Sequence, residues 1–287
     1  MSRGRRATSA RVSVGLAAGL AVGLAVGLAG CGTGPGGSPE ASSAEASAAA
    51  AGSAHTRPSA GPAARPDAIT VFAAASLRTV LEDIGAAFTA QTGTAVRFSY
   101  AGSQDLVAQI LEGAPADVLA TANLATMQQL ADEAPELLRA PAQSFATNTL
   151  TIVTPPDNPA GVGAWPDLAR DGLRLVVCAP EVPCGAATEQ VEASTGATLR
   201  PVSEESSVTD VLAKVVAGEA DAGLVYATDA RGADVATHPC PPCAAAVNTY
   251  PAAALAGGHA DAALRFVDFL TSAPAQKALA EAGFGAP

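Results

Sequence analysis

The sequence predicts an α/β fold of two lobes, each a mostly parallel sheet flanked by helices. Short runs of β-branched and aromatic residues alternate with longer segments whose apolar residues recur at helical spacing. Such alternation is typical of parallel strands joined by helices. The alternation occurs twice, with different residues each time. The body that follows the N-terminal region has about 220 residues, which is enough for two lobes of about 110 residues each.

The first series of elements begins with Ile69-Thr70-Val71-Phe72, a run typical of a strand. Ser76 then precedes a helical face that begins at Leu77 and includes Phe88. The expected strands of this series are residues 69–72, 96–100 and 117–121, and the expected helices begin at residues 77, 103 and 126.

The second series has expected strands at 149–154, 173–178, 222–226 and 235–237, with helices at 185–194 and 208–215. An amphipathic helix at 262–270 and another at 274–282 end the chain. Because the two ends of a domain usually lie close together, we expect these helices to complete the first lobe. Lobe 1 would then comprise residues 67–148 plus 248–287, and lobe 2 residues 149–247.

The N-terminus has the layout of a secretory signal. Four arginines (Arg3, Arg5, Arg6 and Arg11) precede an uncharged, mainly apolar stretch at 12–30. A retained membrane-spanning helix is the alternative, since the stretch is just long enough, but its glycines disfavour this. Leu28-Ala29-Gly30-Cys31 resembles the bacterial lipobox. We therefore expect residues 1–30 to be a signal peptide, and a lipid on Cys31 to anchor the exported protein to the outer face of the cytoplasmic membrane.

Residues 31–66 are almost wholly Gly, Ala, Ser and Pro. They lack the bulky apolar residues that offset the entropy of ordering, so we expect a flexible tether.

The chain is acidic, with a formal net charge of −11, and aromatic residues make up 4% of it. The first thirty residues carry only positive charge, so the remainder is more acidic still. Such a body disfavours binding to nucleic acid or to anionic lipid headgroups. Few aromatic residues also disfavour a sugar receptor built on stacking. An anion would therefore be held by local dipoles rather than by net charge.

Four cysteines remain besides Cys31: Cys178, Cys184, Cys240 and Cys243. An even number in an exported protein favours disulfides. Three pairings are possible, and we expect the local one, Cys178 with Cys184 and Cys240 with Cys243. A zinc site made of all four thiolates is the alternative, because Cys240 and Cys243 have ligand-like spacing. A redox-active Cys-x-x-Cys is also possible, but no thioredoxin-like βαβ unit surrounds it.

Four helix starts are candidates for anion binding. They carry small or hydroxylated residues after a strand, at Ser76, Ser103, Cys184-Gly185 and Ser206-Ser207-Val208. Helix N-termini offer free N–H groups and partial positive charge, and in open α/β sheets they lie at the strand ends where ligands bind. Two starts per lobe, facing each other, would surround an anion with donors. The alternative for each serine is an ordinary helix N-cap.

Several motifs occur in an order that supports this reading. They are Val71-Phe72-Ala73-Ala74-Ala75-Ser76-Leu77, Ser99-Tyr100-Ala101-Gly102-Ser103, Gly113-Ala114-Pro115-Ala116-Asp117, Val182-Pro183-Cys184-Gly185 and Gly223-Leu224-Val225-Tyr226 with Asp229-Ala230. Through them nearly all of the folded body resembles the bacterial periplasmic molybdate-binding proteins, which are the receptors of molybdate ABC importers.

The resemblance implies a periplasmic solute-binding fold with the ligand cleft between the lobes. It also implies an oxyanion held by the hydroxyls of Ser76, Ser103 and Tyr226 and by the backbone N–H groups of Cys184 and Val208. Two positions depart from the family pattern. Cys184 stands where a small apolar residue is usual, and Gly102 where another serine is frequent.

This donor set suits a fully deprotonated dianion such as molybdate, tungstate or sulfate. Phosphate keeps a proton in part of its population at neutral pH and would need an acceptor. We therefore expect an extracytoplasmic lipoprotein that delivers molybdate or tungstate to an ABC transporter permease, acts as a monomer, and needs no cofactor and no bare metal cation. A receptor for another tetrahedral oxyanion, chiefly sulfate, is the alternative.

Other classes of function have little support. The sequence has no Gly-x-Ser-x-Gly turn and no evident catalytic pair of carboxylates, so we do not expect an enzyme. Its histidines (His55, His238 and His259) do not cluster as in a zinc receptor, and paired tyrosines typical of a ferric receptor are not evident. The resemblance also extends to archaeal relatives in which carboxylates join the coordination of the oxyanion's metal, and Glu204 or Glu205 is the candidate for that role in this sequence.

Overall fold

The computed structural model describes residues 68–287. The signal peptide, the lipidation site Cys31 and the tether that the sequence predicts lie outside the described residues. Among the described residues, no helix is long and apolar enough to cross a membrane.

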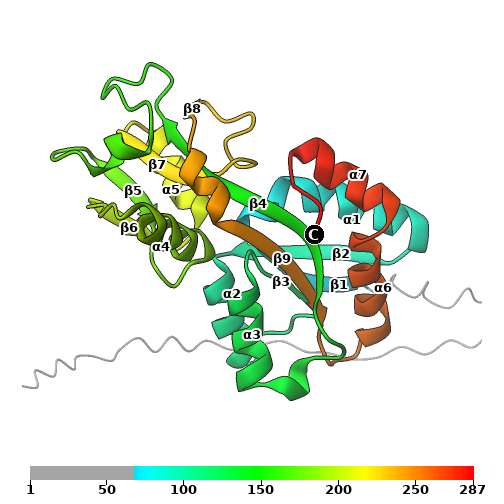
Figure 1. The fold of residues 1–287 in the computed structure, drawn as a ribbon. Helices are drawn as coiled ribbons and strands as arrows, with labels where there is room; N and C mark the ends of the chain where they lie inside the picture. The colour runs from blue at the N-terminus through cyan, green and yellow to red at the C-terminus, as the bar shows by residue number, and fades with distance from the viewer. Residues whose placement is uncertain (1–67) are drawn as a thin grey trace, which may run out of the picture. The chain divides into compact units, whose positions relative to one another are not determined.

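The first lobe is built on three parallel strands (Figure 1). They are β1 (Ala68–Ala74), β2 (Ala95–Ala101) and β3 (Val118–Ala120), in the order β2-β1-β3. The 3₁₀ helix η1 (Ala75–Leu77) leads from β1 into α1 (Arg78–Thr92), whose buried face includes Leu81, Ile84 and Phe88. Helices α2 (Ser103–Leu111) and α3 (Leu124–Glu133) follow β2 and β3.

The second lobe repeats this arrangement with β5 (Leu175–Cys178), β6 (Ser203–Glu205) and β7 (Ala222–Tyr226). Strand β5 pairs in parallel with both β6 and β7. Helix α4 (Pro183–Thr195) follows β5, and α5 (Val208–Val216) follows β6. Between them these strands and helices place two further helix starts at strand carboxyl ends.

Two long antiparallel strands join the lobes. They are β4 (Gln143–Thr154) and β9 (Val247–Ala254), which cross the centre of Figure 1. Strand β9 pairs with β3, β4 pairs with β7, and the short β8 (Ala236–His238) also pairs with β4. The resulting order is β2-β1-β3-β9-β4-β7-β5-β6. The predicted two-lobe α/β fold with crossing strands is confirmed, although the sheet is mixed because every pairing made by β4 and β9 is antiparallel.

The C-terminal helices α6 (Ala260–Leu270) and α7 (Ala273–Ala282) pack against α1. Phe88 of α1 meets Phe266 and Phe269 of α6 edge to face, with ring centroids 5.2 and 5.5 Å apart. Aromatic pairs of this geometry add to the stability that apolar burial already gives.

Several elements do not appear among those expected from the sequence. They are β6, β9 and the 3₁₀ helices η2 (Pro135–Leu137), η3 (Trp165–Ala169) and η4 (Pro241–Ala245). Pro251 disfavours the prediction of β9 from the sequence. A proline has no N–H to donate to the ladder and normally argues against a central strand. The partner strand has an irregular register between Ser144 and Ala146, opposite this proline, and such a bulge accommodates the missing N–H.

Candidate functional site

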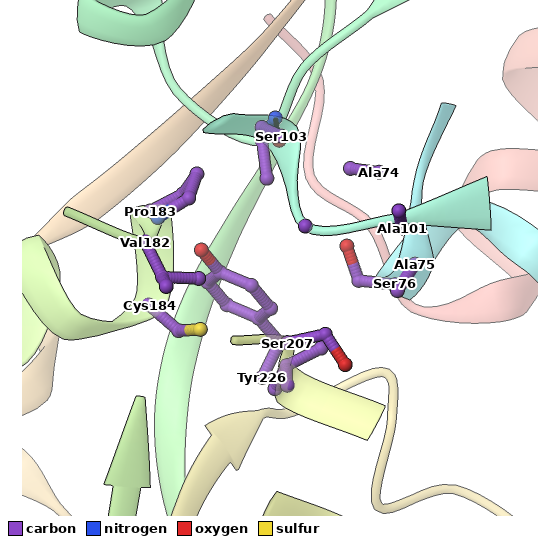
Figure 2. Close-up of a pocket in the computed structure, with 13 residues that line it drawn as sticks. Ala74, Ala75, Ser76, Ala101, Ser103, Val182, Pro183, Cys184, Ser207 and Tyr226 are labelled. Carbon is purple, nitrogen blue, oxygen red and sulfur yellow. Dashed lines mark hydrogen bonds between the residues drawn. The ribbon is translucent and has the colours of Figure 1, made fainter. Parts of the chain in front are cut away.

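A cavity lies where the helix starts of the two lobes meet (Figure 2). It has about 210 Å³ of empty space, its opening to solvent included. All five residues expected to bind the ligand line it, together with neighbours from the same loops. The lining residues are Ala74, Ala75, Ser76, Ala101, Gly102, Ser103, Ala122, Val182, Pro183, Cys184, Ser207, Val208 and Tyr226.

Ser76 lies in η1, the turn between β1 and α1. Its side chain makes no helix-capping hydrogen bond. Instead its Oγ lies 3.1 Å from the hydroxyl of Tyr250, in a contact that is buried. The N-cap alternative therefore does not describe this serine.

Ser103 is the first residue of α2, and the N-cap position before it belongs to Gly102. The buried Ser103 Oγ accepts a hydrogen bond from the Ala122 N–H at 3.0 Å. Since a hydroxyl can accept and donate at once, this bond leaves the Ser103 proton available to a ligand. Ser207, in contrast, is an ordinary N-cap, because its Oγ accepts from the Asp210 N–H at 3.3 Å.

Two backbone donors come from the second lobe. Cys184 is the second residue of α4, and Val208 is the first residue of α5. N–H groups in a first helical turn have no partner within their own helix and carry the positive end of the helix dipole. Both helices therefore direct donors at the cavity.

The start of α4 is held closely against the end of β5. A Cβ added at Gly185 would come closer than 3.0 Å to the Ala179 carbonyl oxygen, so only glycine permits this approach. Cys178 and Cys184 lie at disulfide distance, with their Cα atoms 5.7 Å apart, and Cys240 and Cys243 do so with Cα atoms 5.3 Å apart. These are the two local pairs expected from the sequence.

Tyr226 ends β7, and its ring lies between the start of α4 and Ser76 in Figure 2. Its side chain is buried, and its hydroxyl has no hydrogen-bond partner among the described residues. Burial raises the pKa of the Tyr226 hydroxyl well above its usual value. The group is therefore a neutral donor at physiological pH, and a buried donor without a partner costs about 1–3 kcal/mol unless a ligand satisfies it.

The cavity is lined by hydroxyl, amide and small apolar groups, without a charged side chain from the described part of the chain. Hydroxyl and N–H groups can all donate, whereas no carboxylate of residues 68–287 lines the cavity to accept a proton from a ligand. Such a lining favours an anion that carries no proton.

Three polar residues near the cavity are not among the ligand-binding residues expected from the sequence. Tyr250 contacts Ser76, as described above, and Asn248 bridges the lobes by donating from Nδ2 to the Ala122 oxygen at 2.8 Å and to the Pro183 oxygen at 3.3 Å. Asp229 is mostly buried, and its Oδ2 has no hydrogen-bond partner in the described structure. Burial raises the pKa of Asp229 from 3.8 to about 7.

Asn248 and Tyr250 both belong to β9, which the sequence does not predict. Because side chains alternate along a strand, a strand prediction for these residues would have placed both of them on one face.

Other residues considered from the sequence lie elsewhere. Neither Glu204 nor Glu205 lines the cavity, and Glu205 pairs with Lys214. His238 lies 2.9 Å from the Thr154 hydroxyl, and His259 lies 3.2 Å from Asp117. Within residues 68–287, no three His, Cys, Asp or Glu side chains gather in a group that could hold a metal ion. The four cysteines lie in two separate pairs, so they do not form the four-thiolate zinc site that the sequence left as an alternative.

Two α/β lobes joined by crossing strands, with a cavity between facing helix starts, define the class of solute-binding proteins. Comparison with known proteins agrees with this class. The chain belongs to the family described as bacterial extracellular solute-binding protein, which it matches over residues 69–285.

Relatives with assigned functions resemble the chain over most of its length. The molybdate-binding protein ModA of Mycobacterium tuberculosis is 46% identical over 226 residues, which are 77% of this chain and 85% of that protein. The protein of the same name from Escherichia coli is 33% identical over 230 residues, 75% of this chain and 88% of that protein. The periplasmic molybdate-binding protein of Azotobacter vinelandii has a similar structure, with a TM-score of 0.66 and 24% identity over 76% of this chain and 99% of that one.

Proposed function

We propose that this protein captures molybdate or tungstate outside the cytoplasm and delivers it to the permease of an ABC importer. The observation that carries the proposal is the cavity between four helix starts, which offers hydrogen-bond donors and no charged side chain. The two ModA relatives, at 46% and 33% identity, support the same ligand.

We assign the donors as the sequence predicts. The hydroxyls of Ser76, Ser103 and Tyr226 and the backbone N–H groups of Cys184 and Val208 would each donate to an oxygen of the anion. Their positions around one cavity support this assignment. Local donors of this kind suit a body whose net charge is negative, because the anion then meets oriented dipoles rather than the mean field of the protein.

Existing hydrogen bonds support the direction in which both serines would donate. Ser103 Oγ already accepts from the Ala122 N–H. Ser76 Oγ faces the Tyr250 hydroxyl at 3.1 Å, and burial raises the pKa of Tyr250 above its usual value, which keeps that phenol protonated. If Tyr250 donates to Ser76, both serines have an occupied acceptor site and a free proton that points to the ligand.

The same lining supports discrimination among oxyanions. Phosphate carries a proton for part of the time and would find no carboxylate to accept it. Sulfate has the charge and shape of molybdate, so only the size of the cavity can separate them. A smaller ion would leave donors unpaired, each costing about 1–3 kcal/mol. A sulfate receptor is the second candidate, because its donor requirements are otherwise identical.

We further propose the cellular setting that the sequence predicts. The protein is not an enzyme, acts as a monomer, and is anchored through lipidated Cys31 on the outer face of the cytoplasmic membrane. Its four body cysteines are oxidised in the exported protein. Lobe 1 comprises residues 67–148 plus 248–287, and lobe 2 residues 149–247. Asn148 of β4 is the register partner of Asn248 of β9, so these boundaries fall where the two crossing strands pair.

Calorimetric titration of the purified protein with molybdate, tungstate, sulfate and phosphate tests the proposal. We expect molybdate and tungstate to bind stoichiometrically with similar affinity, and sulfate and phosphate to bind far more weakly. Tight phosphate binding would contradict the assignment of the site. Sulfate binding as tight as molybdate binding would favour the second candidate.

A further inference from the structure

Two loops that carry proposed binding residues touch each other across the cavity. Gly102 directly precedes Ser103 at the start of α2, and Ser206 directly precedes Ser207 and Val208 at the start of α5. A Cβ added at Gly102 would come closer than 3.0 Å to the Ser206 carbonyl oxygen. The backbones of the two lobes therefore meet here at a distance that no side chain larger than hydrogen would allow.

The backbone conformation of Gly102 does not itself require glycine. Its φ of −58° and ψ of 142° are open to any residue. Gly93, by comparison, ends α1 with a φ of 76°, which favours glycine for conformational reasons. The reason for glycine at position 102 is thus the neighbouring lobe.

A hydrogen bond joins the same two loops. Gln104 Nε2 donates to the Ser206 carbonyl oxygen at 2.9 Å. One backbone oxygen of the second lobe is therefore held by a side-chain amide of α2 and covered by Gly102. Both contacts exist only when the lobes lie close together.

We propose that Gly102, Gln104 and Ser206 form a closure contact that sets the distance between the starts of α2 and α5, so that Ser103 and Val208 reach the same anion. The inference rests on the proposed function, because it assigns these three residues a role in closing the oxyanion cleft. They act through Ser103 and Val208 and are positioning residues.

Local rearrangement is a poor way to relieve a side chain at position 102. The Gly102 oxygen accepts the first hydrogen bond of α2, from the Leu106 N–H at 3.1 Å. On the other side, Glu205 accepts from the Ala179 N–H at 2.9 Å and Ser207 caps α5, so the backbone on either side of Ser206 is tied. Separation of the lobes about the crossing strands β4 and β9 is the remaining response. A partly open cleft releases its ligand faster.

The test compares Gly102→Ala and Gln104→Ala with the parent and with Gly258→Ala. Gly258 is the matched control, because it has no atom near its added Cβ and does not have a positive φ. The measurements are the dissociation constant for molybdate, the radius of gyration in solution with and without molybdate, and the melting temperature without ligand.

We expect Gly102→Ala to raise the dissociation constant about ten-fold or more, since it both removes the contact and obstructs closure. It should also enlarge the radius of gyration and reduce the compaction that molybdate produces. Gln104→Ala removes one neutral hydrogen bond and should weaken binding about two- to twelve-fold. Gly258→Ala should match the parent in all three measurements.

The outcomes separate the two proposals. If the parent binds none of the four oxyanions, the proposed function fails, while the ligand-free radii of gyration of the parent and Gly102→Ala still test the closure contact. If the parent binds molybdate and Gly102→Ala binds it as the parent does, the closure contact is wrong. Weaker binding with an unchanged radius of gyration would also overturn it, because it would indicate local distortion of Ser103.

Discussion

The hydroxyl of Ser76 lies 3.1 Å from the hydroxyl of Tyr250, and both side chains are buried. One residue belongs to the turn after β1 and the other to β9, the last strand in the sequence, 174 positions later. A long-range contact of this kind fixes the rotamer of a small side chain that could otherwise turn freely. It also means that Ser76 does not cap a helix, so its replacement affects the cavity more than the helix.

The first prediction concerns the three proposed hydroxyl donors. Hydrogen bonds to charged groups are worth about 1.5–3 kcal/mol, so Ser76→Ala, Ser103→Ala and Tyr226→Phe should each weaken molybdate binding roughly ten- to a hundred-fold. Tyr226→Phe is the cleanest change, because it removes the hydroxyl, keeps the buried ring and touches no helix cap. Calorimetry should show the lost affinity, and the melting temperature of ligand-free Tyr226→Phe should stay nearly constant. If all three variants melt at a lower temperature but bind molybdate as the parent does, these residues have a structural role and do not bind the ligand.

The second prediction concerns Tyr250, which orients Ser76 without lining the cavity. Tyr250→Phe leaves the Ser76 hydroxyl free to rotate, so we expect molybdate affinity to fall by about two- to ten-fold, less than for Ser76→Ala. In the double variant Ser76→Ala/Tyr250→Phe, the two effects should not add, because the phenylalanine keeps the ring packed against Tyr226 and the lost hydroxyl contacts Ser76. Fully additive losses in this double-mutant cycle would show that Tyr250 acts on binding by another route.

The sequence predicts the alternating elements well, because their apolar periodicity is strong and their turns are short. It failed at β9, where three consecutive alanines follow Pro251 and no β-branched run is present. Asn248 and Tyr250 were lost with that strand, since only a strand assignment puts them on one face towards the cavity. Long-range pairing brings β9 between β3 and β4, and nothing local in the sequence indicates that pairing.

The serines illustrate a second limit. A serine before a helix has the same local pattern whether it caps the helix or faces a ligand. In the structure Ser207 caps α5, whereas Ser76 and Ser103 make other contacts. Periodicity could not separate these cases, and the resemblance to a family was needed to select Ser76 and Ser103. The sequence shows Gly102 only as a position without the usual serine, because its contact with Ser206 joins residues from different lobes.

The third prediction compares the two cysteine pairs. Mass spectrometry of unreduced peptides from the exported protein should show Cys178 linked to Cys184, and Cys240 linked to Cys243. Each pair closes a short loop, so replacing either pair by two serines should cost a similar free energy of unfolding, about 2 kcal/mol. Only the first pair reaches the cavity, through Cys184.

Molybdate affinity should therefore differ between the Cys178→Ser/Cys184→Ser protein and the Cys240→Ser/Cys243→Ser protein. Loss of the Cys178–Cys184 link frees the start of α4, and we expect molybdate affinity to fall about three- to ten-fold because the N–H of Cys184 is no longer held in place. The Cys240→Ser/Cys243→Ser protein is the matched control and should bind nearly as the parent does. Equal affinities for both variants would show that the first link serves stability alone, and a crossed linkage would overturn the pairing itself.

The fourth prediction is that Asp229 makes the protein less stable as the pH rises towards neutrality. Burial raises its pKa from 3.8 to about 7, so between these values the folded protein holds a proton that the unfolded chain releases. The free energy of unfolding decreases as the pH rises wherever the folded state binds more protons than the unfolded state. The contribution of Asp229 should thus be complete below about pH 4, decline between about pH 4 and pH 7, and stay low above that range. The total change is on the order of 2–4 kcal/mol.

Asp229→Asn isolates this contribution, because asparagine has nearly the same shape and does not titrate. Urea unfolding of both proteins at pH 5 and pH 8 gives the difference in their free energies of unfolding at each pH, from which the effects of all other ionisable groups cancel. We expect that difference to move in favour of the asparagine variant at pH 8, where the parent must bury a carboxylate whose Oδ2 has no partner in the described structure. A difference that is the same at both pH values would mean that Asp229 titrates as an ordinary exposed carboxyl.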